Sequence, residues 1–168
     1  EFKIPHDVLV AWINEMLGYL ARETEEDVLN SVLETHQSIW GDRYESWDRM
    51  SPWEKVGLTV EGMRGHLSGS SRKGDVKVID EGDRFAISFD PCGTGGVLRR
   101  GDPETGRTAY MDASMSEEPH EWVWDDKTNI HWYCAHCAIA MEWLPGRKRG
   151  HPLRPLDHSM DHDAPCVW

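Results

Sequence analysis

Residues 75–90 read DVKVIDEGDRFAISFD, and this stretch decides the fold because its apolar side chains recur at every second position. The first half alternates at Val76 and Val78, and the second half alternates again from Phe85 onward. A period of two residues predicts β-strands that have one face buried. The tripeptide 81–83 between the two halves, Glu-Gly-Asp, is typical of a tight turn. The sequence therefore predicts a β-hairpin.

Ahead of the hairpin the apolar spacing changes to three and four residues, which is the period of a helix. This pattern covers residues 5–22 and then residues 24–40. A third helix is predicted from Ser51, because Ser51, Pro52 and Glu54 follow the order of an N-cap, a first helical residue and a capping-box partner. We expect these helices to pack chiefly through Trp12, Leu17, Val28, Ile39, Trp53 and Val60.

Beyond the hairpin the apolar runs are shorter, and they predict further short strands. We expect strands near Val97 to Arg99 and near Thr108 to Met111, and one more across the sequence NIHWYC at 129–134. The segment AIAMEWL at 138–144 favours a helix that ends at a Pro-Gly pair. From residue 150 onward the chain is rich in proline and histidine without periodicity, which predicts an irregular tail.

Together these patterns predict one α+β domain that spans all 168 residues. N-terminal helices in a helical part, residues 1–69, would pack on a small antiparallel β-sheet in a β-rich part, residues 75–146. The tail, residues 147–168, would dock back onto this body, because it ends in the apolar pair Val-Trp. The hydrophobic content of 39% and the nine tryptophans are typical of a globular chain with a substantial core.

The charge and the cysteine content exclude some classes of partner. The formal net charge of -12 argues against nucleic-acid binding, which depends on clustered Lys and Arg. No segment has the roughly 18 apolar residues that a membrane-spanning helix needs. The start EFKIPHDVLV lacks the order of a signal peptide, and the four cysteines form no dense framework. We therefore expect a reducing, cytoplasmic setting.

The four cysteines predict a metal site. Cys134 and Cys137 form a C-x-x-C pair in HWYCAHC, and such pairs present two sulfurs to one ion. Cys92 is followed by a glycine-rich stretch, residues 93–96, that can turn tightly around a ligand. Cys166 lies two residues before the end of the printed sequence, where a bond to metal would anchor the tail. The four thiolates would form the closed tetrahedral set of a structural zinc ion.

Histidines offer an alternative ligand set and a catalytic interpretation. His131 or His136 could replace Cys166 as a ligand, and iron could replace zinc, since thiolate and imidazole bind both. A site with three protein ligands and an open position would be catalytic. The candidates for a general base near a metal-bound water are His120, Glu121, His131 and His66.

Three functions are consistent with this site. The first is a metal-assisted hydrolase or lyase that acts on a small organic molecule, since tryptophan and histidine gather near the cysteines. The second is a non-catalytic binding module or redox sensor with a structural zinc ion bound by four cysteines. The third is a thiol enzyme in which Cys92 is the nucleophile, the amides of residues 93–96 bind an oxyanion, and His120 or His131 is the base.

Overall fold

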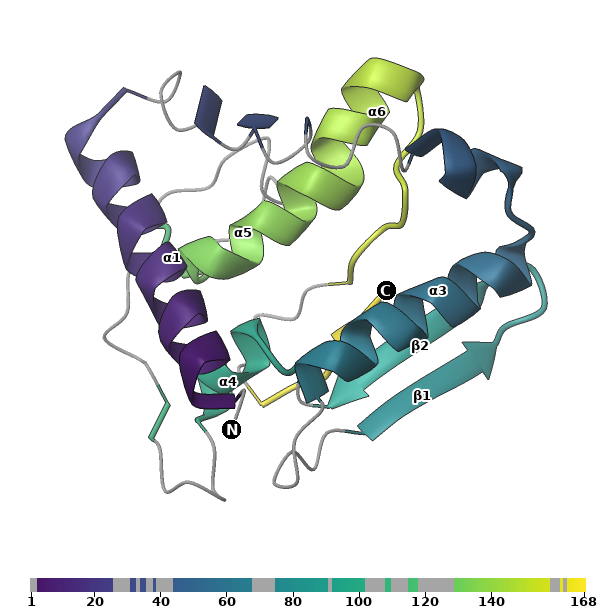
Figure 1. Cartoon of the computed structure of the whole chain (residues 1–168), viewed down its shortest axis with the longest axis horizontal. Coiled ribbons are helices and arrows are strands. Elements are labelled where there is room, and N and C mark those ends of the chain that lie inside the picture. Colours follow the sequence, from purple (N-terminus) through teal and green to yellow (C-terminus); the bar gives the residue numbers. More distant parts are fainter. Residues whose placement is uncertain are drawn as a thin grey trace. The chain divides into compact units, whose positions relative to one another are not determined.

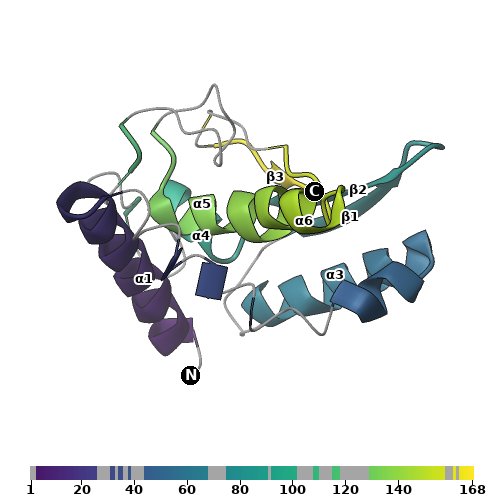
Figure 2. The same cartoon turned by 90° about the horizontal axis from the view of Figure 1, so that it is seen from above.

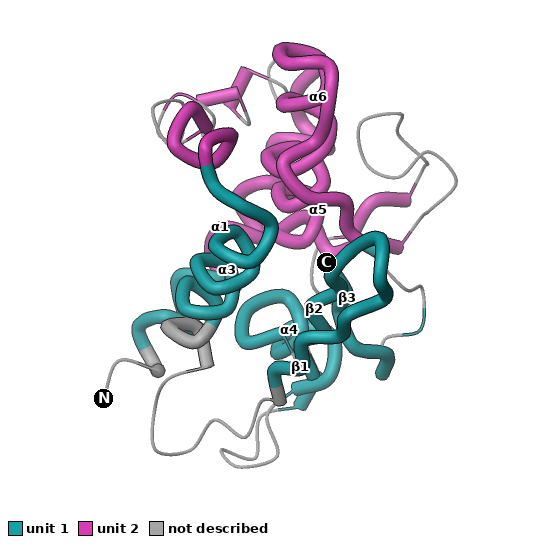
Figure 3. The backbone as a smooth tube through the Cα atoms, turned by 90° about the vertical axis from the view of Figure 1, so that its right-hand side faces the viewer, with its two compact units in different colours: residues 1–10, 50–112, 157–168 teal, residues 11–49, 113–156 magenta. Residues whose placement is uncertain are grey.

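The structure is a computed structural model that describes residues 3–25, 31–32, 34–35, 38, 44–67, 75–90, 92–101, 108–109, 115–117, 129–157, 161 and 163–168. These residues form helices and one three-stranded antiparallel sheet, so the predicted α+β class is confirmed at this level. The backbone divides into two compact units (Figure 3). Unit 1 comprises residues 1–10, 50–112 and 157–168, and unit 2 comprises residues 11–49 and 113–156.

The hairpin in unit 1 is confirmed. Strands β1 (Asp75–Asp80) and β2 (Phe85–Asp90) pair antiparallel, with Val78 opposite Ile87 (Figure 1). Gly82 in the turn has a φ of 92°, a conformation that glycine adopts without strain. Ile87 and Phe89 on β2 are buried, so the alternation in the sequence marks the buried face of this strand.

The third strand, β3 (Cys166–Val167), comes from the tail that the sequence analysis predicted to be irregular. Cys166 pairs with Phe89 of β2, and Trp168 exchanges backbone hydrogen bonds of 2.7 and 2.9 Å with Ile87. The indole of Trp168 also packs edge-on against Phe89, with ring centroids 5.1 Å apart. A strand of this length is too short to show an alternating pattern in the sequence. Its conformation depends on pairing with β2.

Helix α3 (Pro52–Leu67) begins with the predicted capping box. The backbone N–H of Ser51 donates to Glu54 at 2.8 Å, and the backbone N–H of Glu54 donates to the Ser51 hydroxyl at 3.3 Å. Figures 1 and 2 show α3 running along the hairpin within unit 1. At the start of the helix the Trp53 ring lies 5.2 Å from the ring of Phe85, which places α3 against β2.

Residues 97–99 do not form the predicted strand. They belong to helix α4 (Gly95–Arg100), which begins after Thr94 and ends at Gly101. The backbone N–H of Val97 donates to the carbonyl of Thr94 at 3.0 Å, and that of Gly101 donates to Val97 at 2.9 Å. A run of three residues is too short to distinguish a strand period from a helix period, and here the local hydrogen bonds are those of a helix.

The strand predicted across residues 129–134 is also wrong. Helix α5 (Trp132–Ala138) begins there and continues through a π-helical segment η1 (Ile139–Trp143) into α6 (Leu144–Arg149), as Figure 2 shows. The residues ahead of the helix keep a strand-like contact, an isolated antiparallel bridge between His131 and Met115. The apolar residues of α5 instead form the core of unit 2, which consists of Leu17, Ile130, Trp132, Cys134, Ala135, Ala138, Ile139 and Leu144.

Helix α1 (Lys3–Glu23) confirms the first predicted helix, but the predicted packing set is only partly right. Leu17 is buried and Val60 is half-buried. Trp12 and Trp53 are 61% and 63% exposed, so their assignment to the core is wrong. A helical period identifies a stripe of apolar residues but does not determine which part of that stripe a neighbour covers. Val28 and Ile39 lie outside the described residues.

Two further predictions fall partly on residues that the structure does not describe. In the helix expected at 24–40, residues 24 and 25 are not helical, whereas the other described residues, 31, 32, 34, 35 and 38, are helical. Residues 44–49 form another helical stretch. In the strand expected at 108–111, residues 108–109 have no regular structure and the other two lie outside the described part. Across the described helices, no segment is both long and apolar enough to cross a membrane.

Candidate functional site

The C-x-x-C pair lies in the first turns of α5, within unit 2. Cys134 is buried and Cys137 is half-buried. Residues three apart on a helix are neighbours on its surface, so the two thiols project from the same side of α5. The helix begins at this point because the backbone N–H groups of Cys134 and Ala135 donate to the carbonyl of His131, at 2.7 and 3.2 Å.

The structure brings His136, one of the two predicted alternative ligands, close to this pair. The Nε2 atom of His136 lies 3.6 Å from the sulfur of Cys137. Its Nδ1 atom contacts the backbone carbonyl of Tyr133, and the two rings pack edge-to-face with centroids 4.6 Å apart. His131, the other alternative, is buried just before the helix begins. Among the described residues, one imidazole and one thiol of the predicted site are therefore in direct contact.

Asn14 of α1 positions the start of α5, and the sequence analysis missed it. Its side chain is fully buried, and its Oδ1 atom accepts the backbone N–H of Tyr133 at 2.8 Å. The N-cap residue of α5 makes no side-chain capping hydrogen bond. Asn14 instead accepts one of the N–H groups that the first turn of a helix leaves without an intrahelical partner. A polar residue three positions before the buried Leu17 is the sequence signal that could have revealed it.

The other two cysteines lie in unit 1. Cys92 follows β2, and its sulfur lies 3.2 Å from the hydroxyl of Thr94. The glycine-rich stretch that follows, residues 93–96, is buried throughout. Cys166 in β3 is buried, and its sulfur accepts the indole N–H of Trp168 at 3.1 Å. Each of these thiols therefore has a short polar contact within its own segment.

The structure brings together only some of the predicted site residues. Cys92 and Cys166 belong to unit 1, whereas Cys134 and Cys137 belong to unit 2. Within the described part of the chain, no group of three or more Cys, His, Asp and Glu side chains is arranged to hold a metal ion. None of the four cysteines, all of which are described, forms a disulfide. His120, Glu121 and the side chain of His66 lie outside the described residues.

Comparisons with models of known protein families, with curated proteins and with solved structures find no match to this chain, so the site is interpreted from its own residues.

Proposed function

We propose that this chain is a small metal-binding protein of the zinc-thiolate type, and that Cys134 and Cys137 are its first pair of ligands. The observation that carries the proposal is the placement of both thiols on one turn of α5, with the His136 ring 3.6 Å from Cys137. Thiolate and imidazole are the ligands that zinc prefers, and iron accepts the same set.

The remaining ligands are predicted from the sequence. Cys92 and Cys166 would complete a closed set of four thiolates, and such a site is structural. With three protein ligands and an open position, the ion would instead activate water or polarise a substrate. The protein would then be a metal-assisted hydrolase or lyase for a small organic molecule, with His120, Glu121, His131 or His66 as the general base.

Metal content per chain tests the proposal. The protein is loaded with Zn²⁺ or with Fe²⁺ under reducing conditions, freed of excess ion, and measured by elemental analysis together with a thiol count. We expect about one ion per chain in the parent protein and loss of that ion in the double variant Cys134→Ser/Cys137→Ser. His151→Ala is the control, because His151 is exposed and has its contact with the neighbouring Pro152 carbonyl. Stoichiometric metal in the double variant would contradict the proposal.

The single variants Cys92→Ala and Cys166→Ala assign the other ligands. Loss of metal in both variants supports the closed, structural site. Retention of metal in Cys166→Ala supports three ligands and an open position, which favours the hydrolase or lyase over the structural site. In the closed case Cys166→Ala also makes residues 157–168 more sensitive to protease, because metal binding then contributes to folding.

A second candidate function is thiol chemistry at Cys92. It is favoured by the 3.2 Å contact between its sulfur and the Thr94 hydroxyl, beside buried glycines whose amides could face an oxyanion. Alkylation by iodoacetamide, followed by mass spectrometry in the metal-free protein, distinguishes this function. Cys92 reacting faster than Cys166, which is also buried, favours the thiol enzyme. Paired oxidation of Cys134 and Cys137 would favour the redox sensor instead.

A further inference from the structure

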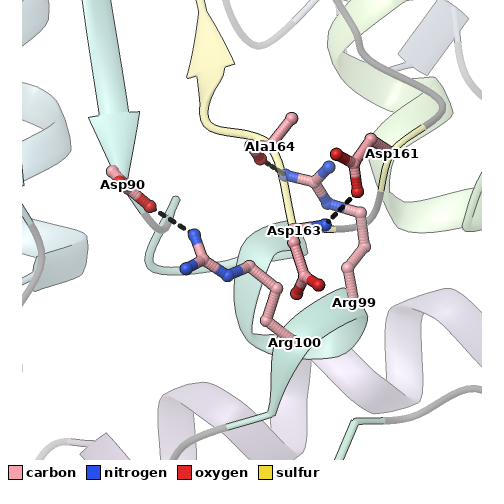
Figure 4. Close-up of polar contacts among 6 residues, drawn as sticks. All are labelled: Asp90, Arg99, Arg100, Asp161, Asp163 and Ala164. Atoms are coloured by element: carbon pink, nitrogen blue, oxygen red, sulfur yellow. Dashed lines mark hydrogen bonds and ion pairs between the residues drawn. The ribbon is translucent and has the colours of Figure 1, made fainter.

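Arg99 of α4 is a buried cation whose hydrogen-bonding capacity is largely unused. The residue is 4% exposed, and neither its Nε nor its Nη1 atom has a hydrogen-bond partner. The remaining nitrogen, Nη2, donates to the backbone carbonyl of Ala164 at 3.5 Å, the long limit for such a bond (Figure 4). Most of the five N–H donors of this guanidinium therefore have no acceptor.

Two other arginines of the chain have an ion-pair partner. Arg100, next to it on α4, forms an ion pair with Asp90 (Figure 4). In unit 2, Arg149 forms an ion pair with Asp48 and lies over the ring of Tyr44 at 5.5 Å. A buried charge is costly unless an opposite charge and hydrogen bonds compensate it. Within the described part of unit 1, Arg99 is a buried charge whose hydrogen bonds and opposite charge are incomplete.

Residues 161, 163 and 164 of the tail lie beside Arg99 (Figure 4). The backbone N–H groups of Asp163 and Ala164 donate to Asp161, at 2.9 and 3.1 Å. Figure 4 shows the carboxylates of Asp161 and Asp163 on either side of the Arg99 side chain. Neither carboxylate accepts a hydrogen bond from the Nε or Nη1 atom of Arg99, and both residues are exposed.

We propose that Arg99 is the anchor of a binding site for a small oxyanion, a carboxylate or a phosphate, which the guanidinium binds when its long contact to the Ala164 carbonyl breaks. A guanidinium presents N–H donors in a planar fork that matches the oxygens of both groups, and the buried position strengthens each charge-assisted bond. The anion supplies the hydrogen-bond acceptors that the Nε and Nη1 atoms of Arg99 lack. The site uses none of the residues of the proposed thiolate centre, so the two proposals stand or fall separately.

Anion binding by Arg99→Lys and Arg100→Lys variants tests the proposal. Inorganic phosphate and acetate are titrated separately by calorimetry, in a chloride buffer of fixed ionic strength. The parent protein and Arg100→Lys bind at least one of the two anions, and the stronger binder identifies the class. Arg99→Lys keeps the charge but loses the fork, and we expect its affinity to fall about tenfold or more. Equal affinities in the two variants, or no binding by the parent protein, would overturn the proposal.

Stability without added oxyanion provides an independent readout. Arg99→Met removes the uncompensated charge while keeping a long apolar side chain, so we expect its Tm to exceed that of the parent protein. A lower Tm would overturn the proposal, because it would mean that Arg99 already has its partners in the free protein. The variant Asp161→Asn/Asp163→Asn tests the tail carboxylates as that partner. Anion binding that appears only in this variant would likewise overturn the proposal.

Discussion

At the scale of single residues, the most informative side chains are polar groups on buried faces. Asn14 on α1 is fully buried, and it makes a 2.8 Å hydrogen bond to the backbone of α5, 119 positions away along the chain. Its contact partner cannot be read from local periodicity, because the bond links two helices that are distant in sequence. Through this bond Asn14 helps to hold the turn that carries the two cysteines of the proposed metal site.

We predict that Asn14→Ala destabilises the protein by about 1–3 kcal/mol, because it removes the buried acceptor of the backbone N–H of Tyr133. Urea unfolding followed by circular dichroism measures the loss. Glu23→Ala is the control, since Glu23 is exposed on the same helix, and we expect a change within about 0.5 kcal/mol. Equal effects of the two substitutions would mean that the bond to Tyr133 contributes little.

At the scale of elements, α3 is the helix whose start the sequence determines most directly. The capping box links Ser51 and Glu54 in both directions. Hydrogen bonds from the backbone N–H and then from the hydroxyl of Ser51 lower the pKa of Glu54 below its ordinary value of 4.5. A carboxyl group with a lowered pKa stabilises the fold above its ordinary pKa, and this contribution is lost as the pH falls through the lowered value.

We therefore predict that Ser51→Ala lowers the Tm by about 2–4 °C near neutral pH. The difference from the parent protein shrinks as the pH is reduced below 4.5 and Glu54 becomes protonated. Thermal melts across this pH range check both statements. Ser46→Ala, at an exposed helical serine, should show neither effect. If the Tm difference between Ser51→Ala and the parent protein stays constant with pH, the stabilising effect of the cap does not depend on the ionisation of Glu54.

At the scale of the whole molecule, unit 1 is assembled from segments at both ends and in the middle of the chain. The tail closes this unit by adding β3 to the hairpin, and Trp168 covers Phe89 there. Trp53 at the start of α3 also contacts a phenylalanine of β2, but it remains largely exposed. The two tryptophans thus differ mainly in burial and in the backbone pairing around them.

We predict that Trp168→Ala destabilises unit 1 by about 2 kcal/mol or more, since it uncovers Phe89 and removes the indole donor to Cys166. Trp53→Ala is the matched control, and we expect a loss below about 1 kcal/mol because that ring is mostly in water. Urea unfolding followed by far-ultraviolet circular dichroism avoids interference from the other tryptophans. A larger loss for Trp53→Ala would contradict this assignment of the tail to the core of unit 1.

The sequence by itself determined the features that depend on neighbouring residues. The hairpin at 75–90, α1 and the capped start of α3 follow from side-chain period, turn residues and capping residues, all of which act within a few positions. The C-x-x-C pair was likewise visible from its spacing. The conformation of the pair was not predicted correctly, because Cys134 and Cys137 lie on a helix and not on a strand. The ligands beyond this pair stay predictions.

Only the tertiary structure decided the features that depend on residues far apart in the chain. The short segments at 97–99 and 129–134 fit either period, and packing and local hydrogen bonds made residues 97–99 and 132–134 helical. The two-residue strand β3 exists because β2 supplies its partners, and the exposure of Trp12 depends on which helix face a neighbour covers. The buried charge of Arg99 likewise could not be inferred from the sequence, since burial is a property of the folded chain and not of any one segment.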